Sequence, residues 1–282
     1  MTIAVHRLDA ALGAEVTGID FDRPLTAAEK TLLQRAIDEH LALVFHNDEP
    51  LSNEQVVRLC EQFGPLRPTL ADKSRLPGFP GINRVSNRDA NGVVGTGGSD
   101  VVTWHSDLSF TPPLIEFLYL DAQELPSSGG DTKWLNLVAA HDDLPVETRG
   151  RIANLTVRYR LRDGLDFNNY FKASDGESLR DETEISLVQT NPRNGRKSVW
   201  PNIGPDFSAQ VVGMSGDDSA LLLKELYAHC TQEKFVYRHN WRVGDSALWI
   251  NTQTMHEREA FPGDQVRVLR HVNILGVADP HQ

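Results

Sequence analysis

The segment TWHSDLSF at residues 103–110 places a histidine and an aspartate two positions apart. If this segment is a β-strand, His105 and Asp107 lie on one face of it, because side chains alternate along a strand. An imidazole nitrogen and a carboxylate oxygen on one face can bind the same metal ion. The pattern is short and recurs by chance, so a metal site also requires a ligand from elsewhere in the chain.

His256 is the candidate for that further ligand. It lies 149 residues after Asp107, in NTQTMHERE, just past the strand-like stretch SALWIN. Two imidazoles and one carboxylate form the facial triad that holds non-haem Fe(II) and leaves coordination positions open. The spacing excludes a helical zinc site of the His-x-x-x-His kind. We interpret the remaining histidines, apart from His271, as structural or surface residues.

Arg267 adds a second charged position to this pattern. It follows His256 by eleven residues, inside the alternating apolar run VRVLRHVNIL, where Arg267, Leu269 and His271 share one face. An arginine that points into a β-barrel interior needs a partner, because an unpaired buried charge is costly. A bound carboxylate suits the planar guanidinium, and an internal aspartate or glutamate is the alternative partner.

Two capping boxes predict helices near the N-terminus. Thr26 with Glu29 and Ser52 with Gln55 each have the required spacing, and apolar residues at helical spacing follow both pairs. The run LALVFH between these helices, at 41–46, is typical of a buried strand.

Short β-prone runs separated by turns dominate the chain from residue 103 onward. Helices are expected to interrupt them near 138–152 and 217–230. The runs are TWHSDLSF, LIEFLYLDA, TKWLNL, LTVRYRL, KSVWPN, FVYRHNW, SALWINT and VRVLRHVNIL. Many short strands with a few outer helices predict a mainly β fold with flanking helices, a sandwich or a jelly roll. No linker divides residues 1–282, so we expect a single domain.

Residues 67–102 are rich in glycine, proline, asparagine and aspartate. A long irregular stretch inside a compact domain is either functional or disordered. We expect this segment to be a lid that orders over a bound substrate, with its glycines allowing the movement.

Composition narrows the partners and the compartment. The formal net charge is −11 and no run of lysine and arginine occurs, which argues against nucleic-acid binding. The N-terminal residues lack the pattern of a signal peptide, and no apolar run reaches the ~18 residues of a membrane span. Cys60 and Cys230 both lie in helix-like contexts, so we expect buried reduced thiols and a cytoplasmic protein.

Five motifs extend these observations over nearly the whole chain. They are LGAEVTGIDFDRPLT, LALVFHNDEPLSNEQVVRLCEQFGPL, WHSDLSF, LPSSGGDTKW and WRVGDSALWINTQTMH, in this order. Together they resemble the taurine dioxygenase family, which includes aryloxyalkanoate dioxygenases and belongs to the Fe(II)- and 2-oxoglutarate-dependent oxygenases. The resemblance implies a double-stranded β-helix, or jelly-roll, core.

The resemblance also implies roles for individual residues. His105, Asp107 and His256 would bind Fe(II), and 2-oxoglutarate would chelate the iron. The far carboxylate of 2-oxoglutarate would pair with Arg267, assisted by Thr132. The implied reaction uses O2 to convert 2-oxoglutarate to succinate and CO2 while a C–H bond of a small molecule is hydroxylated or desaturated. Related halogenases carry a small residue at the position of Asp107, so halogenation is not expected.

Two positions depart from the sulfonate-using members of the family. Sulfonate-using and aryloxyacetate-using members both carry an arginine four residues after the cosubstrate arginine, where this chain has His271, and Arg270 comes one residue early, on the opposite face of a strand. The sulfonate-using members also carry an asparagine four residues before the first ligand, where this chain has Val101. Taurine is therefore not the expected substrate.

A small anionic or amino-acid-like metabolite is the expected substrate. Its carboxylate could be held by protonated His271 or by an arginine from elsewhere, such as Arg158, Arg160 or Arg162. Trp200, in KSVWPN, falls where the family has an aromatic wall of the substrate pocket, and ordinary core packing is the alternative for it.

Two other classes of protein compete with this interpretation. A non-catalytic jelly-roll binding module could retain the metal site, although all five of the metal and cosubstrate positions are intact. A zinc hydrolase could use the same three ligands, but it leaves Arg267 without a role. The resemblance further implies association into homodimers or homotetramers.

Overall fold

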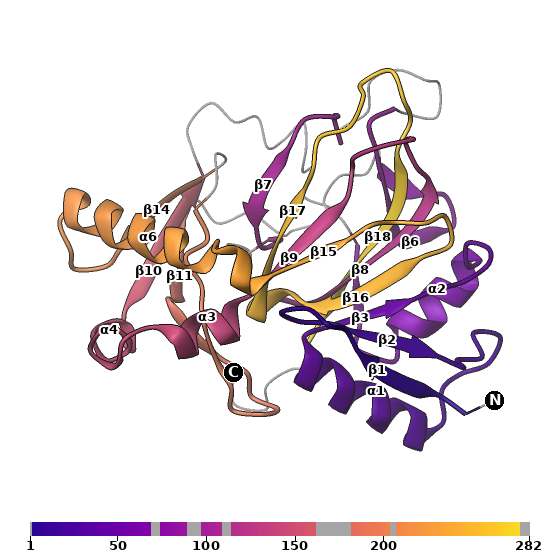
Figure 1. The fold of residues 1–282 in the computed structure, drawn as a ribbon, viewed down its shortest axis with the longest axis horizontal. Helices are drawn as coiled ribbons and strands as arrows, with labels where there is room; N and C mark the ends of the chain where they lie inside the picture. The colour runs from indigo at the N-terminus through magenta and orange to yellow at the C-terminus, as the bar shows by residue number, and fades with distance from the viewer. Residues whose placement is uncertain are drawn as a thin grey trace.

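Two β-sheets face each other in the computed structural model, which describes residues 2–68, 74–88, 97–108, 114–161, 182–203 and 207–276 (Figure 1). Among these residues the larger sheet has the strand order β1-β2-β3-β16-β8-β18-β6-β5, with β4 paired to β18. Its strands are β1 (Ala4–Arg7), β2 (Ala14–Thr17), β3 (Ala42–Phe45), β4 (Leu66–Arg67), β5 (Arg75–Leu76), β6 (Phe79–Ser86), β8 (Ile115–Glu124), β16 (Ser246–Ile250) and β18 (Val268–Leu275).

The smaller sheet has the strand order β15-β9-β17-β7. Its strands are β7 (Val102–His105), β9 (Thr132–Asn136), β15 (Val236–His239) and β17 (Thr254–Arg258). Side chains alternate between its two faces, as a pleated sheet requires. His105, Trp134 and His256 are cross-strand partners and share the inner face. One sequence neighbour of each of these three points to the opposite face, where it belongs to a separate apolar core behind the sheet. The inner face is therefore the one that can hold polar side chains of a functional site.

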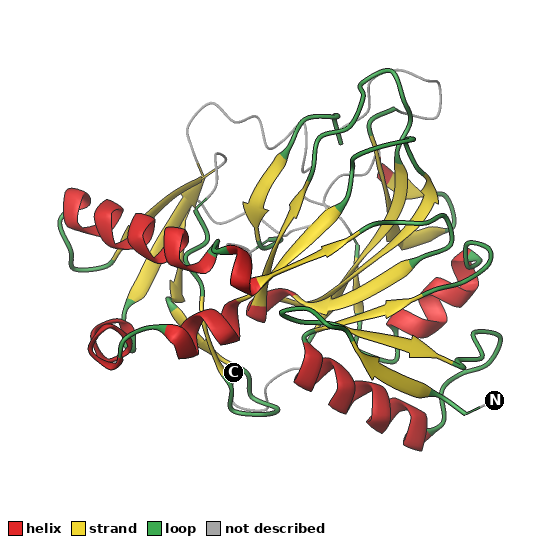
Figure 2. Cartoon of the chain, in the orientation of Figure 1, coloured by secondary structure: helices red, strands yellow, loops and turns green. Residues whose placement is uncertain are grey.

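Helices cover the outer sides of the two sheets (Figure 2). On the larger sheet these are α1 (Ala27–His40) and α2 (Asn53–Cys60), and the Phe63 ring just after α2 lies 5.7 Å from the Phe117 ring of β8. Behind the smaller sheet lie α3 (Leu137–Asp143), α4 (Val146–Ile152) and α6 (Gly216–Cys230), with the shorter strands β10 (Thr156–Leu161), β11 (Glu182–Ser186), β12 (Val188–Thr190), β13 (Lys197–Val199) and β14 (Phe207–Val211).

The predicted helices and most predicted strands are confirmed. Both capping boxes are formed, with Thr26 and Ser52 as the N-caps of α1 and α2. The helix expected near 138–152 is instead two short helices, α3 and α4. They are separated at Leu144 and Pro145, both in extended backbone, as expected because a proline disfavours helical geometry in the residue before it. Among the helices in the described ranges, none has both the length and the apolar character that crossing a bilayer requires.

The prediction of one irregular segment over 67–102 is wrong in its middle part. β6 occupies eight of these residues and pairs along β18 inside the larger sheet. Its glycines serve a hairpin and close packing. Gly78 has φ +81° in the turn between β5 and β6, and a Cβ on Gly81 would lie 3.0 Å from the side chain of Leu66. The segments 69–73 and 89–96 lie outside the described residues, so the expected lid falls partly there.

Candidate metal centre and cosubstrate arm

The two histidines of the predicted metal site are neighbours on adjacent strands. His105 on β7 is the direct partner of His256 on β17, and their ring centroids are 4.1 Å apart. Nδ1 of His105 lies 2.7 Å from the carbonyl oxygen of Thr103, so this nitrogen carries the proton and donates it. The unprotonated Nε2 therefore faces the site, which is the arrangement that a metal-binding imidazole needs.

Asp107 joins these histidines, but not by strand alternation. β7 ends at His105, and Asp107 lies in a turn whose next residue, Leu108, has φ +47°. The side chain of Asn251 holds this turn in place of a strand partner. Its Oδ1 accepts from the Asp107 backbone N–H at 3.0 Å, and its Nδ2 donates to the Asp107 carbonyl oxygen at 2.9 Å. Asn251 is 1% exposed, so a buried amide fixes the direction of the carboxylate.

Ser106, between the two ligands, is fixed from the opposite side. Its hydroxyl donates to the Thr254 carbonyl oxygen at 2.8 Å and accepts from the Trp200 indole N–H at 2.7 Å. The buried amide of Asn202 contacts both the N–H and the carbonyl oxygen of Ser106, each at 3.4 Å. Trp200 is 1% exposed. It therefore lies in the core behind the smaller sheet and supports the ligand turn from there. From the sequence, core packing was the alternative to a wall of the substrate pocket.

The three predicted ligands converge on one point. Nε2 of His105 lies 3.2 Å from Oδ1 of Asp107, and Nε2 of His256 lies 3.7 Å from the same oxygen. One ligand atom from each residue falls within 4.8 Å of the other two. Two imidazoles and a carboxylate that surround a common point match the facial triad of non-haem iron sites.

The protonation states of these groups favour metal binding. Burial, with a smaller contribution from the neighbouring His105, lowers the pKa of His256 to about 3, so the ring is neutral at physiological pH. Burial works to raise the pKa of Asp107, but the electrostatic contacts with the neighbouring histidines, His105 and His271 first, outweigh it and hold this pKa well below its usual range. The site thus offers a neutral His256 imidazole and an ionised carboxylate, the forms that bind metals.

His271 is a third histidine at this carboxylate. Its Nε2 lies 3.1 Å from Oδ2 of Asp107, the oxygen that the other two histidines do not share. It reaches the site from β18, so the larger sheet contributes to the centre as well as the smaller one. The predicted face of Arg267, Leu269 and His271 is therefore the inner face. Arg270 points the other way, as expected from its register, and forms an ion pair with the buried Asp121.

Arg267 ends in a buried position without an acidic partner. It is 3% exposed, and among the described residues no carboxylate lies within ion-pair distance of its guanidinium. Its Nε donates to the Gly130 carbonyl oxygen at 2.9 Å, and its backbone N–H donates to the side chain of Asn87 at 3.0 Å. Burial, with a smaller contribution from Arg258, lowers the pKa of Arg267 to about 9, so it remains a cation at neutral pH.

The Gly-Gly-Asp-Thr turn shapes the surroundings of this arginine. A Cβ on Gly130, which has φ +73°, would lie 3.0 Å from the Arg267 side chain, so only glycine leaves the arginine its place. Thr132 follows on β9, where its hydroxyl accepts from the Trp241 indole N–H at 2.9 Å. Because that contact uses the oxygen as an acceptor, the hydroxyl hydrogen can be donated to another group.

Arg258 is a second buried arginine here that sequence reasoning missed. It is the cross-strand partner of Thr132 on β9. Its guanidinium donates to the carbonyl oxygens of Gly97 at 2.6 Å and Gly98 at 3.1 Å, and also to that of Asp100. Its spacing of two from His256 is the signal that could have placed it on the inner face.

The alternative anion-binding residues lie elsewhere. Arg158 is on the solvent face of the β10 sheet in an ion pair with Glu184 at 2.6 Å, and Arg160 is exposed on the same face. Arg162 lies outside the described residues. Val101 is 50% exposed just before β7.

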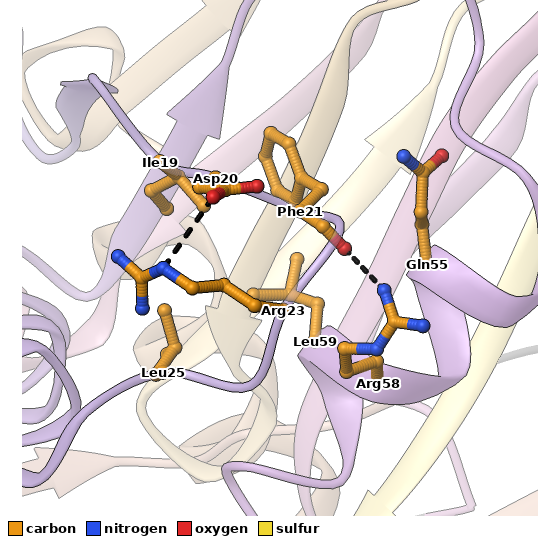
Figure 3. A pocket seen from close by; sticks show the side chains of 8 residues that line it. All are labelled: Ile19, Asp20, Phe21, Arg23, Leu25, Gln55, Arg58 and Leu59. Carbon is orange, nitrogen blue, oxygen red and sulfur yellow. Dashed lines mark hydrogen bonds and ion pairs between the residues drawn. The ribbon is translucent and has the colours of Figure 1, made fainter. Parts of the chain in front are cut away.

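A small pocket lies apart from these residues, between the segment 19–25 and α2 (Figure 3). Its arginines are already engaged: Arg23 forms ion pairs with Asp20 at 3.4 Å and Glu29 at 2.7 Å, and Arg58 donates to the Phe21 carbonyl oxygen at 2.6 Å. It offers no uncompensated charge, and we assign it no function.

Two facing β-sheets, a His-Asp-His centre and an interior arginine without an acidic partner in the described part of the chain are the features of metal-dependent jelly-roll oxygenases. The family model of the taurine catabolism dioxygenase TauD, TfdA family matches residues 4–273, and the chain belongs to this family. Its members are dioxygenases that use Fe(II), 2-oxoglutarate and O2 and act on small molecules. The predicted enzyme class, jelly-roll fold and cofactors are thereby confirmed.

Individual relatives agree with this membership. The chain is 31% identical to the alpha-ketoglutarate-dependent 2,4-dichlorophenoxyacetate dioxygenase of Cupriavidus pinatubonensis, over 98% of each chain. It is 32% identical to the pentalenolactone F synthase of Streptomyces arenae, over 92% of this chain and 89% of the relative. Among solved structures, AAD-2 in complex with Mn(II) and N-oxalylglycine superposes with a TM-score of 0.78 at 29% identity, over 99% of each chain.

Proposed function

We propose that this enzyme oxidises an unactivated C–H bond of a small anionic or amino-acid-like metabolite, with His105, Asp107 and His256 as the iron ligands. In the hydroxylation form the balanced reaction is R–H + O2 + 2-oxoglutarate → R–OH + succinate + CO2. In the desaturation form two C–H bonds are broken and water is released in place of the hydroxyl group. The observation that carries the proposal is the convergence of three ligand atoms within 4.8 Å, together with a buried arginine on the inner face that has no acidic partner among the described residues.

The donor set fits Fe(II). Two neutral imidazoles and one carboxylate occupy one side of the ion, which leaves positions for 2-oxoglutarate and O2. The bound iron supplies the activation of O2, and the protein supplies position, charge and the exclusion of water. Nδ1 of His105 donates to the Thr103 carbonyl oxygen, which directs Nε2 to the metal position.

Arg267 and Thr132 are the proposed binding groups for the far carboxylate of 2-oxoglutarate. Arg267 is a buried cation, and a carboxylate would supply the partner that the protein itself does not. The Thr132 hydroxyl accepts from Trp241, so its own hydrogen is available to a carboxylate oxygen. Gly130 orients the arginine by accepting from its Nε. Charge pairing at this end would fix which end of 2-oxoglutarate reaches the metal.

Succinate release tests the reaction. Purified protein with Fe(II), ascorbate and O2 should convert 2-oxoglutarate to succinate, and a screen of small carboxylates, amino acids and sulfonates should contain compounds that accelerate this conversion. A protein that forms no succinate under any condition and retains no metal would contradict the proposal. The non-catalytic alternative predicts that Mn(II) and 2-oxoglutarate bind while no succinate forms, and no observation favours it.

The same proposal includes a cytoplasmic location and a homodimer or homotetramer. Both cysteines are buried and free, which suits a reducing compartment. Light scattering after size-exclusion chromatography tests the assembly, and a monomer of 31.4 kDa at micromolar concentration would contradict that part.

A further inference from the structure

Aromatic rings form a continuous line from the metal centre to the edge of the smaller sheet. Trp134 on β9 is the direct partner of both His256 on β17 and Tyr237 on β15, so these side chains share the inner face. The Trp249 ring, from β16 of the larger sheet, lies 5.3 Å from the His256 ring and 5.3 Å from the Trp134 ring. The Trp134 ring stacks on the Tyr237 ring at 5.8 Å. Trp249, Trp134 and Tyr237 are here called the aromatic path.

Packing by itself would account for rings in contact. Aromatic side chains bury much apolar surface and often meet edge to face or offset in a core. Trp134 and Trp249 are both 0% exposed and belong to the main apolar core, whereas Tyr237 is half-buried on β15, the edge strand. The path therefore runs from the buried centre toward solvent, and the feature that sets it apart from packing is the polar network at its outer end.

The Tyr237 hydroxyl has a proton acceptor in place. Burial raises the pKa of Tyr237 to about 12, so the hydroxyl keeps its proton at neutral pH. This hydroxyl lies 3.0 Å from Nδ1 of His239, and Nε2 of the same imidazole lies 3.3 Å from Oδ2 of Asp245. A carboxylate at this distance favours the tautomer with the proton on Nε2, which leaves Nδ1 to accept from the hydroxyl. Tyr237 can therefore pass its proton to His239 when it loses an electron.

This acceptor makes Tyr237 the most easily oxidised position on the path. When a phenol loses an electron and a proton together it becomes a neutral radical, and here the positive charge moves to His239 beside the Asp245 carboxylate. The indole Nε1 atoms of Trp134 and Trp249 have no hydrogen-bond partner among the described residues. An indole oxidised there stays an unpaired cation, which burial disfavours. An electron vacancy should therefore move outward through the indoles and come to rest on Tyr237.

We propose that the aromatic path supplies electrons to the metal centre when O2 and 2-oxoglutarate react without a substrate in place. The oxidising power that would otherwise attack the iron ligands is carried to Tyr237, where a reductant from solution can restore the tyrosine. The path protects the enzyme and takes no part in the oxidation of the substrate. The inference rests on the proposed function in one respect, the assignment of His256 as the ligand beside Trp249.

Electrons and protons balance when a one-electron reductant such as ascorbate is present. Without a substrate the overall change is 2-oxoglutarate + O2 + 2 e− + 2 H+ → succinate + CO2 + H2O. Tyr237 gives up one electron at a time through the tryptophans, while its hydroxyl proton moves to Nδ1 of His239. Ascorbate then returns an electron to the tyrosyl radical, and His239 returns the proton. Two such cycles complete one turnover, and the protons of the water come from ascorbate through the solvent.

Detection of the radical tests the outer end of the path. Fe(II)-loaded protein is mixed with 2-oxoglutarate and O2, without substrate or ascorbate, and samples frozen at intervals are studied by electron paramagnetic resonance. We expect a neutral tyrosyl radical in the wild type and its loss in Tyr237→Phe, which keeps the ring and removes the hydroxyl. Tyr119→Phe is the matched control and should keep the radical. Tyr119 is fully buried, but it follows Leu118, the partner of Trp249, and so faces away from the path.

Interruption of the path tests its middle. Trp134→Phe leaves Tyr237 and its hydrogen bond to His239 in place, but its ring is much harder to oxidise. The radical should be lost in this variant, while Mn(II) affinity stays as in the wild type. Both Trp134→Phe and Tyr237→Phe should become inactive after several-fold less succinate has formed per enzyme. A radical that persists in either variant, or equal lifetimes of Tyr237→Phe and the wild type, would assign the rings to packing alone and overturn the inference.

Succinate formation separates this inference from the proposed function. It is measured in the same frozen samples of the wild type. Succinate without a tyrosyl radical would reject the aromatic path and leave the proposed function standing. No succinate at all would reject the proposed function and the aromatic path with it.

Discussion

Among the described residues, two aspartates are each contacted by more than one histidine, yet only one of these clusters has the geometry of a metal site. Asp107 directs one oxygen, Oδ1, toward both His105 and His256, at 3.2 and 3.7 Å. Asp245 instead gives each of its oxygens a separate histidine: His46 at 2.6 Å from Oδ1 and His239 at 3.3 Å from Oδ2. Both clusters join residues that are far apart in sequence.

The difference lies in convergence and access rather than in composition. A metal ion needs ligand atoms around one point, and histidines on opposite oxygens of a carboxylate diverge from such a point. The Asp245 side chain is 2% exposed, against 23% for Asp107, and it also accepts from the Arg242 backbone N–H at 3.0 Å. In the described part of the chain, only the Asp107 cluster qualifies as a three-ligand group. The Asp245 cluster is therefore a closed structural network.

The largest expected effect is on metal affinity, which should fall when Asp107 is replaced and not when Asp245 is replaced. Asp107→Ala in chloride-free buffer should weaken Mn(II) binding by well over the ~100-fold that loss of an outer-shell partner causes, since a ligand itself is removed. Asp245→Ala should leave Mn(II) affinity unchanged and lower stability by about 1–3 kcal/mol, because the buried His239 and the exposed His46 both lose their partner. Calorimetry and urea denaturation measure the two effects. A loss of Mn(II) affinity in Asp245→Ala would contradict the separation of the Asp245 cluster from the metal centre.

A second prediction concerns the cation beside the open cluster. Arg267→Ala should weaken 2-oxoglutarate binding by about 3 kcal/mol, on the order of 100-fold, because a buried charge pair loses one partner. Mn(II) binding should remain, since Arg267 contacts none of the three ligands. Calorimetric titration of 2-oxoglutarate into the Mn(II)-loaded variant measures this. Arg242→Ala, beside the closed Asp245 cluster, is the matched control and should leave 2-oxoglutarate affinity as in the wild type.

Much of the fold was predictable because local signals carry it. Capping boxes gave the starts of α1 and α2, and alternating apolar residues gave strands such as β8 and β18. β6 was not predicted, because the glycines and prolines in it and just before it are typical of a loop. The reason for Gly81 is its contact with Leu66 on another strand, which no local pattern contains.

The convergence of the three proposed ligands agrees with the sequence prediction, but the residues that hold them were not predictable. Alternation grouped His105 with Asp107, but the reason was wrong, because β7 ends at His105 and the carboxylate is held in a turn. Its support, Asn251, comes from 144 residues away. The polar contact of His271 with Asp107 joins the two sheets. Such contacts depend on how distant strands meet, and the sequence contains no spacing rule for them.

A third prediction tests that hidden support. Asn251→Ala removes both hydrogen bonds to the Asp107 backbone and should weaken Mn(II) binding ~10-fold or more, the usual effect of losing an outer-shell partner. Asn191→Ala is the control, because Asn191 is equally buried and bonded, but to Gln253 rather than to a ligand. Calorimetry with Mn(II) should show a loss in the first variant only. Equal losses would mean that general destabilisation, not positioning, sets the affinity.

The smallest effect is in the pH dependence of stability. Burial lowers the pKa of His256 to about 3 in the folded protein, whereas an unfolded histidine titrates near ~6.5. Between these values the unfolded state binds more protons. The free energy of unfolding of the metal-free protein should therefore fall as the pH decreases from about 6.5, by at most ~1.4 kcal/mol per pH unit.

The Asp245 cluster should respond in a different pH window. Burial works to raise the pKa of Asp245, but hydrogen bonds from His239 and His46 lower it overall. A carboxylate with a lowered folded pKa stabilises the protein above its unfolded value of about 3.9 and loses that contribution only at more acidic pH. Urea denaturation of chelator-treated protein at pH 7, 6 and 5 separates the two clusters. His256→Gln should flatten this slope and Asp245→Asn should retain it, and a slope that is unchanged in His256→Gln would show that His256 does not fold as a neutral, metal-ready imidazole.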